Sequence, residues 1–223
     1  MTPPRVVAID GAAGSGKSTL ARALARELSL PYVNTGWMYR ALAAAAVRSN
    51  VLPNDVATLL QLTESLRFTL EGTDPVELEV EGYDRDELTS VEVEETVPAV
   101  ASHEDVRKTM VAKQRDIGKD GAVMEGRDIG RVVFPDAPVK LYLTADPSVR
   151  AARRTDERSA DGPSVAEALR ARDERDAVTN PFDPADAATS IVDTDSLDVE
   201  ETLAFALKVV GKRAPWLLPD GDA

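Results

Sequence analysis

The stretch "RVVAIDGAAGSGKSTLARALAREL", residues 5–28, decides the fold of this chain. Its first part, residues 5–10, is a short apolar run of the kind that is buried in a parallel sheet. Its last part, residues 20–28, repeats apolar residues at helical spacing, and a glycine-rich loop separates the two. The stretch therefore predicts a strand, a loop and a helix, in that order.

The loop at residues 11–19, "GAAGSGKST", fits the pattern G-x-x-x-x-G-K-[ST]. Glycines allow successive backbone N–H groups to turn inward around phosphate oxygens, at the positive end of the following helix. We expect Lys17 to reach the β- and γ-phosphates of ATP and the Ser18 hydroxyl to hold Mg²⁺. The alternative is a glycine-rich turn that matches by chance. The expected ATP-binding residues are Gly11, Ala12, Ala13, Gly14, Ser15, Gly16, Lys17, Ser18 and Thr19.

Composition excludes several classes of protein. The 223 residues contain no cysteine, which excludes disulfides and thiolate metal sites, and can bury a core as one domain. There are 26 Lys and Arg against 39 Asp and Glu, a net charge of −13, which disfavours nucleic acid or an anionic membrane as the main partner. The first residues lack the apolar segment of a signal peptide, and no apolar run approaches transmembrane length. We therefore expect a cytoplasmic protein.

The rest of the chain alternates between strand and helix patterns, as in a doubly wound α/β fold. Further buried strands are expected at residues 31–35, 121–125, 139–145 and 190–194. Asp146 followed by Pro147 is typical of the start of a helix. Residues 67–82 differ, because apolar and acidic residues alternate after a "GTDP" turn. We expect a small antiparallel insertion there, outside the parallel sheet.

A segment rich in arginine follows the 139–145 strand. Its arginines are Arg150, Arg153, Arg154, Arg158, Arg170, Arg172 and Arg175, and no lysine occurs from residue 150 to 175. The planar guanidinium suits bidentate phosphate recognition, and two helices joined by "SADGP" could form a lid that excludes water during phosphoryl transfer. The alternative is a pair of solvated helices whose arginines pair with neighbouring acids.

The motif at residues 11–19 does not distinguish a kinase from a GTPase switch or a motor. An Asn-Lys-x-Asp element, which guanine specificity usually needs, does not occur. The segments "NTGWMYR", "SVEVEETVPAVASHEDVRKTMVAKQR", "MEGRDIGRVVFPDAPVKLYLTADPSVRAARR" and "RARDERD" make the chain resemble the bacterial cytidylate kinases from end to end. The "TGxxYR" and "GRDxG" elements are far more specific than the phosphate loop.

The resemblance implies a P-loop NTPase fold, with a central parallel sheet flanked by helices, a small antiparallel monophosphate-binding insertion and a helical lid. It implies a single kinase domain, residues 1–223, with a core at 1–36, 120–150 and 187–223, a monophosphate-binding lobe at about 37–119 and a lid at about 151–186. The implied reaction is the phosphorylation of CMP and dCMP by ATP with Mg²⁺. We expect a monomer.

The resemblance also implies roles for individual residues in the CMP site. Thr35 and Arg107 should contact the base, Arg40 and Arg127 the acceptor phosphate, and Arg172 with Asp176 the ribose. Asp128 should face the exocyclic amine of cytosine, since a carboxylate is an acceptor only. The expected catalytic residues are Lys17, Arg127, Asp128 and Arg172. Arg127 and Asp128 could instead form a mutual surface salt bridge, and Thr35 could cap the following helix.

The chain departs from the usual family pattern at three positions. Asn34 stands where an acid is usual, Pro98 where a serine is usual, and Thr179 where an arginine that contacts phosphate is usual. Arg131 or Arg175 could compensate for the missing arginine. Two other functions stay open at this point: a P-loop kinase of UMP or a nonnucleotide metabolite, and a noncatalytic nucleotide-binding switch.

Overall fold

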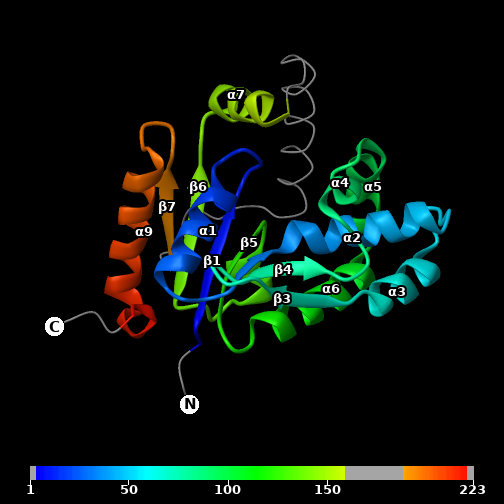
Figure 1. The fold of residues 1–223 in the computed structure, drawn as a ribbon, viewed down its shortest axis with the longest axis horizontal. Helices are drawn as coiled ribbons and strands as arrows, with labels where there is room; N and C mark the ends of the chain where they lie inside the picture. Colours follow the sequence, from blue (N-terminus) through cyan, green and yellow to red (C-terminus); the bar gives the residue numbers. More distant parts are fainter. Residues whose placement is uncertain (1–3, 159–187, 220–223) are drawn as a thin grey trace.

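The computed structural model describes residues 4–158 and 188–219. These residues form a seven-stranded sheet in the order β3-β4-β2-β5-β1-β6-β7 (Figure 1). The strands are β1 Val6–Gly11, β2 Tyr32–Asn34, β3 Phe68–Glu71, β4 Glu77–Val80, β5 Ala122–Gly126, β6 Val139–Thr144 and β7 Thr189–Asp193. Strand β1 lies between β5 and β6 and pairs with both in parallel. The expected parallel core is therefore confirmed.

The insertion after residue 66 is only partly as expected. Strands β3 and β4 form an antiparallel hairpin, with Phe68 opposite Val80 and Glu71 opposite Glu77. However, β4 also pairs in parallel with β2, at Tyr32 and Glu77, so the hairpin extends the main sheet. The expectation that it lies outside that sheet is wrong. Alternation along one strand shows that a face is buried, but it does not show which strand becomes the neighbour.

Helices cover both faces of the sheet. They are α1 Lys17–Glu27, α2 Thr35–Arg48, α3 Val56–Ser65, α4 Arg85–Leu88, α5 Val91–Ala101, α6 Glu104–Gly118, α7 Pro147–Arg158 and α9 Val199–Arg213, with a π-turn η1 Ile129–Val133 and a 3₁₀ turn η2 Pro215–Leu217. Helix α7 begins where the Asp-Pro pair predicts, and Asp146 accepts a hydrogen bond from Ser148 N at 2.8 Å. Among the described residues, no helix is both long and apolar enough to cross a membrane.

The core has two parts, one on each face of the sheet. Val6 and Ala8 of β1 belong to the part that α2, α3, α5 and α6 cover. Val7 and Ile9 belong to the part that α1 and α9 cover. This division follows from the period of a strand, in which successive side chains point to opposite faces. Residues 6–9 of β1 are apolar at every position, so this part of the strand must be buried on both sides.

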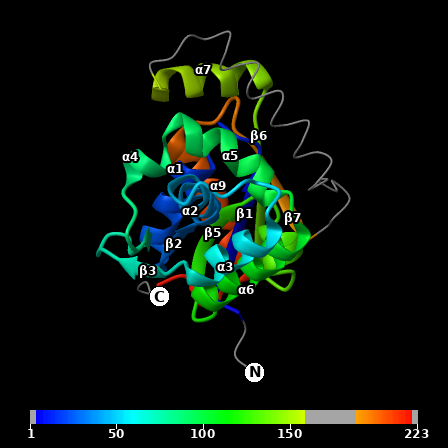
Figure 2. The ribbon, with the colours of Figure 1, turned by 90° about the vertical axis from the view of Figure 1, so that its right-hand side faces the viewer.

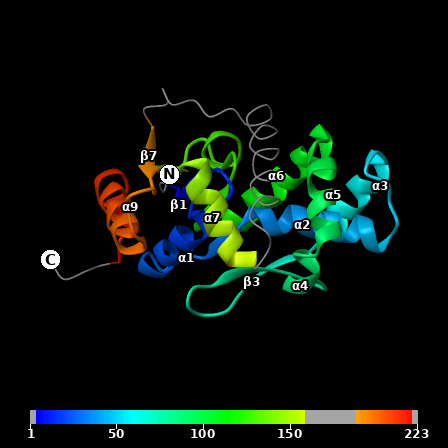
Figure 3. The same cartoon turned by 90° about the horizontal axis from the view of Figure 1, so that it is seen from above.

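Helix α7 lies beyond the carboxyl ends of the central strands. Figures 1 and 2 show it above the sheet, and Figure 3 shows it across the start of α1. Its close approach to the loop between β1 and α1 is visible at Gly14, where a Cβ would lie 2.9 Å from Arg150 O. This edge of the sheet is where ligands of open α/β folds bind.

The packing of α3 gives a test of the fold. Leu59 of α3 is fully buried, whereas Leu52, in the preceding loop, is 68% exposed. Leu59→Ala should lower the free energy of unfolding by ~2–5 kcal/mol, because it removes buried surface and leaves a cavity. Leu52→Ala, the same substitution, should change it by less than ~0.5 kcal/mol. Urea unfolding of both variants measures the difference, and equal losses would contradict the position of α3.

Candidate functional site

The loop between β1 and α1 has the shape of a phosphate cradle. Gly11, Gly14 and Gly16 have positive φ angles of 147°, 74° and 86°. A Cβ at Gly11 would lie 2.3 Å from Leu143 O, so no larger residue fits there. Gly16 is the N-cap of α1 and can supply no side-chain cap to the first amides of the helix. Uncapped amides at a helix start bind anions well.

Lys17 and Ser18 start α1 directly beside this cradle. The Lys17 ammonium group donates a hydrogen bond to Ala12 O at 2.6 Å, so the side chain lies back across the loop. Ser15 is fully buried, and its hydroxyl finds no hydrogen-bond partner among the described residues. The expected ATP-binding residues, 11–19, are therefore gathered at one end of β1, with the lysine amine over the loop.

Glu125, at the end of β5, joins the cradle to the next strand. Its Oε2 accepts a hydrogen bond from the Ser18 hydroxyl at 3.0 Å, and its Oε1 accepts one from the Tyr32 hydroxyl. Burial and the nearby Glu125 charge raise the pKa of Tyr32, so this hydroxyl keeps its proton and donates. Glu125 is only 3% exposed. The sequence-based prediction gives Glu125 no role, although an acid at the end of an apolar strand could have indicated a site residue.

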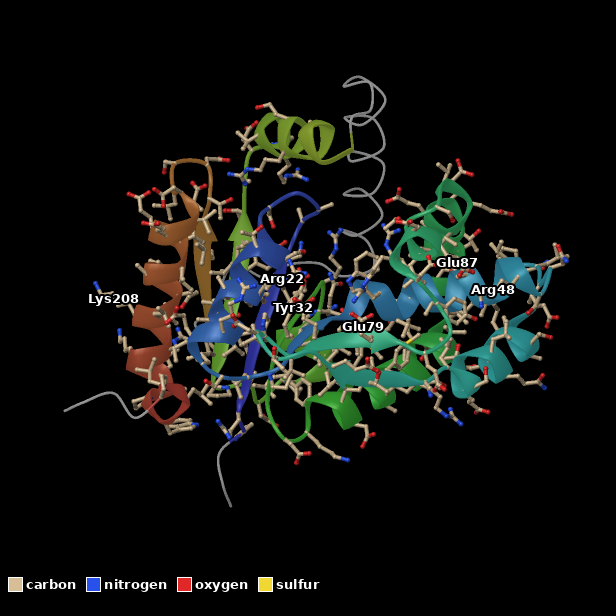
Figure 4. All side chains as sticks on the ribbon, viewed as in Figure 1. Arg22, Tyr32, Arg48, Glu79, Glu87 and Lys208 are labelled. Atoms are coloured by element: carbon tan, nitrogen blue, oxygen red, sulfur yellow. The ribbon has the colours of Figure 1, made fainter. Side chains whose placement is uncertain are left out.

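Tyr32 is itself held from the other side. The Arg22 guanidinium lies 4.9 Å from the centre of its ring and pairs with Glu77 of β4 at 2.6 Å. Figure 4 shows Arg22 and Tyr32 next to each other beside the hairpin. The position of Glu125 thus depends on residues of α1, β2 and β4.

Ser18 and Glu125 could hold a magnesium ion. A hydroxyl and a carboxylate are the hard oxygen ligands that Mg²⁺ prefers, and here they lie within hydrogen-bond distance. In the parts of the chain that the structure describes, no three His, Asp or Glu side chains gather into a metal site. Mg²⁺ usually keeps several waters and takes further ligands from substrate phosphates.

A second group of residues interacts through charge and comes from three different segments. Burial raises the pKa of Tyr39, the negative charge of Asp128 raises it further, and the positive charge of Arg107 opposes the shift. These three residues come from α2, the end of β5 and α6, so the fold brings them together. Asp128 and Arg107 were expected in the CMP site, and Tyr39 is an addition that the "TGxxYR" element could have indicated.

Thr35 does not cap α2, so that alternative is wrong. Asn34 is the N-cap, and its side chain accepts a hydrogen bond from Gly36 N at 2.9 Å. Thr35 is the first helical residue, and its buried hydroxyl donates to Glu125 O at 2.8 Å. Asparagine is as good a cap as threonine, and the Thr35 hydroxyl finds its partner on β5. The contact of Thr35 with a base stays a prediction.

Arg40 is held by the α4–α5 region. Its guanidinium donates to Leu88 O at 2.9 Å and to Glu94 at 2.8 Å, and its side chain is 14% exposed. The ring centre of Trp37 lies 5.7 Å from it. The expected role of Arg40 on the acceptor phosphate stays a prediction. The same holds for Arg127, which is half-buried and directly follows β5.

Two arginines of α7 anchor this helix, Arg150 to the cradle and Arg153 to Thr194, directly after β7. Arg150 is 5% exposed and donates to Ala145 O at 3.0 Å and to Ala13 O at 3.3 Å. Arg153 donates to Thr194 O at 2.7 Å. These contacts are structural, and neither arginine pairs with an acid in them. The side chains of Arg154 and Arg158, and all of Arg170, Arg172, Arg175, Asp176 and Thr179, lie outside the described residues.

Asp10, the residue before Gly11, is a further buried acid that sequence reasoning missed. Its two oxygens accept hydrogen bonds from Ile129 N and Gly130 N, both at 2.8 Å. Burial raises the pKa of Asp10 to about 6, and the Asp128 charge adds to the shift, while the two amides and Lys17 oppose it. Nothing local marks such a contact, because 119 residues separate the partners.

Comparisons with known proteins agree with this geometry. A family model described as cytidylate kinase matches residues 7–212. A cytidylate kinase from Mycobacterium leprae is 39% identical over 225 residues, which cover 94% of this chain and 96% of that protein. A bifunctional pantoate ligase/cytidylate kinase from Prochlorococcus marinus is 38% identical, and the match covers 96% of this chain but 46% of that protein. This chain thus spans less than half the length of several relatives that it matches.

Solved structures share the fold at low sequence identity. A sugar kinase from Janibacter sp. superimposes with a TM-score of 0.51 at 16% identity, and the match covers 97% of this chain and 99% of that chain. At this identity the likeness concerns the fold alone.

The pKa of Asp10 leads to a prediction about stability. It is 3.8 ordinarily and about 6 in the folded chain, so folding favours the protonated form. The stabilising contribution is complete below the ordinary value and is lost as the pH rises through about 6. Relative to Asp10→Asn, the wild type should therefore lose up to ~3 kcal/mol of unfolding free energy between about pH 4 and 7.

Urea unfolding at a series of pH values measures this difference. Asp55→Asn is the control, because hydrogen bonds from Thr58 lower the pKa of Asp55. Its difference from the wild type should not shrink as the pH rises. A flat difference for Asp10→Asn would contradict the raised pKa of Asp10.

Proposed function

Because this chain belongs to the cytidylate kinase family, we propose that it transfers the γ-phosphoryl group of ATP to CMP or dCMP, giving ADP and CDP or dCDP. The observation that supports this proposal is the joining of two sites at one edge of the sheet. Glu125 contacts Ser18 of the cradle, and Asp10 contacts the turn that follows Asp128. A donor site and an acceptor site so joined suit direct, in-line transfer.

On the donor side, the amides of residues 11–19 hold the phosphates of ATP. Lys17 leaves Ala12 O and pairs with the β- and γ-phosphates, where its charge offsets the charge of the transferred group. Ser18 and Glu125 would hold Mg²⁺, which would neutralise negative charge on the phosphates. No covalent intermediate on the protein is needed, because catalysis is positioning and charge neutralisation.

On the acceptor side, Asp128 and Arg107 read the edge of the base. Cytosine offers an exocyclic amine to a carboxylate, and its N3 and O2 to a guanidinium. Uracil has a carbonyl oxygen in place of this amine, so two hydrogen-bond acceptors would face each other at Asp128. Thr35 lines the same pocket, and Arg40 and Arg127 hold the acceptor phosphate. Arg172 and Asp176 hold the ribose. Arg127 and Arg172 also assist the transfer of the phosphoryl group. The charges of Asp128 and Arg107 both act on Tyr39.

The proposed organisation remains a single kinase domain that acts as a monomer in the cytoplasm. Residues 1–36, 120–150 and 187–223 form the core, about 37–119 the monophosphate-binding lobe and about 151–186 a lid. The contacts of Arg150 and Arg153 would fix the first part of this lid to the donor site.

One assay tests the proposed reaction against its alternatives. ADP release from ATP should be fastest with CMP and dCMP among the acceptors CMP, dCMP, UMP, AMP and shikimate. Preference for UMP or shikimate would assign the chain to another acceptor class. Release with none of them would favour a nucleotide-binding switch.

Lys17→Met tests the donor site. The variant should keep the fold, because the half-buried Lys17 side chain hydrogen-bonds the loop carbonyl of Ala12 and a methionine side chain can fill its space. Turnover should fall by about a hundredfold or more, since the removed charge is used at the transferred phosphoryl group. Steady-state kinetics with a circular dichroism spectrum measure both properties. Turnover like that of the wild type would refute the proposed kinase mechanism.

Asp128→Asn tests the reading of the base. The variant keeps the shape of the side chain but replaces an acceptor with a group that can also donate. The ratio of kcat/KM for CMP to that for UMP should fall about tenfold or more, which corresponds to one mismatched buried group. An unchanged ratio would show that another residue reads the base.

A further inference from the structure

The π-turn η1 leaves amides at its start that its own backbone does not satisfy. Val132 N and Val133 N donate to Asp128 O at 2.7 and 3.3 Å, and Phe134 N donates to Ile129 O at 2.7 Å. The amides of Ile129 and Gly130 come earlier in the turn and take no part in these backbone bonds. A helical turn of any kind begins with such unsatisfied donors, and a side chain usually accepts from them.

Asp128 occupies the position from which that side chain normally comes. It is the N-cap residue of η1, and aspartate is among the best N-cap residues. Nevertheless, its side chain makes no capping hydrogen bond to the turn. The cap comes from Asp10 of β1, whose two oxygens accept from Ile129 N and Gly130 N at 2.8 Å each. Asp10 is 8% exposed, so these bonds lie out of water.

The turn is also packed so that it cannot shift easily to find another cap. A Cβ at Gly126 would lie 2.6 Å from Ile129 Cδ1 and 2.7 Å from the Thr35 hydroxyl. Gly130 lies against Lys140 of β6, where a Cβ would be 3.2 Å from the lysine stem. Asp10 therefore meets the two amides at a fixed place, one residue before the phosphate cradle.

We propose that Asp10 is a positioning residue for base recognition, which caps η1 in place of Asp128 and so leaves the Asp128 carboxylate to the acceptor pocket. This inference rests on the proposed function, in which Asp128 reads cytosine. Asp10 touches neither substrate in this role. It acts through the backbone of residues 129 and 130, and its negative charge disfavours the approach of a second carboxylate to the start of the turn.

Asp10→Asn removes this capacity while it keeps the shape of the side chain. An amide can accept from one of the two N–H groups but must present its own donor to the other. The turn then lacks one acceptor, and Asp128 is the nearest N-cap group able to supply it. The ratio of kcat/KM for CMP to that for UMP should fall at least fivefold, with a higher KM for CMP, while KM for ATP changes less than twofold.

A double-mutant cycle separates positioning from a general structural effect. If Asp10 acts through Asp128, Asp10→Asn should leave the CMP to UMP ratio unchanged, within twofold, in an Asp128→Asn background. Asp55→Asn is the matched control: Asp55 caps α3 by accepting from Thr58 N at 3.1 Å, far from either site, and its loss should leave all kinetic constants unchanged. If Asp10→Asn does not fold, Asp10→Ser, which keeps one acceptor oxygen, replaces it in the cycle.

The outcomes are distinct. Loss of discrimination that depends on Asp128 supports the inference. Two results would overturn it while the wild type still phosphorylates CMP. The CMP to UMP ratio could be unchanged in Asp10→Asn, which includes equal losses of kcat/KM for both nucleotides. Asp10→Asn could also lower the ratio equally in the wild type and in Asp128→Asn. A wild type that phosphorylates no nucleotide would overturn the proposed function, and the inference with it.

Discussion

The parallel pairing of β1 with β5 is the constraint on which the whole site depends. Its register sets Ile9 beside Glu125 and Asp10 beside Gly126, so the two strands end at the same edge. The phosphate cradle follows β1 and the "GRDIG" segment follows β5. Two segments that are more than 100 residues apart in the chain therefore begin side by side, so the proposed donor and acceptor sites share one edge of the sheet.

Two buried acids make this meeting place rigid. Burial of a carboxylate is costly unless hydrogen bonds compensate it, and both acids are compensated from other segments. Glu125 receives hydroxyl groups from α1 and β2, and Asp10 receives amides from η1. Glu125 therefore links β5 to α1 and β2, and Asp10 links β1 to η1. An apolar residue in place of either acid would leave these donors unpaired.

The part of the site that could be predicted from sequence is the part with a local signature. The cradle at residues 11–19 is contiguous, whereas the roles that the "TGxxYR" and "GRDxG" elements give to Arg40, Arg127 and Asp128 stay predictions. Contacts made through space were missed: Asp10 on η1, Glu125 on Ser18, and β4 on β2. Hydrophobic periodicity shows which face of an element is buried, but the partner of a buried polar group is decided by register and packing. The capping role of Asn34 was missed because Thr35, its neighbour, is an equally suitable cap by type.

The stacking of Arg40 near Trp37 has an optical consequence. Indole emission is sensitive to the charge and hydration around the ring, and Arg40 and Arg85 lie 5.7 and 4.5 Å from the ring centre of Trp37. The chain has two tryptophans, and the other, Trp216, lies in η2 after α9. Trp37 is thus a natural fluorophore beside two arginines, and Trp216, in another element, can serve as an internal reference. Rearrangement of the guanidinium groups around this ring can be followed in the unlabelled protein.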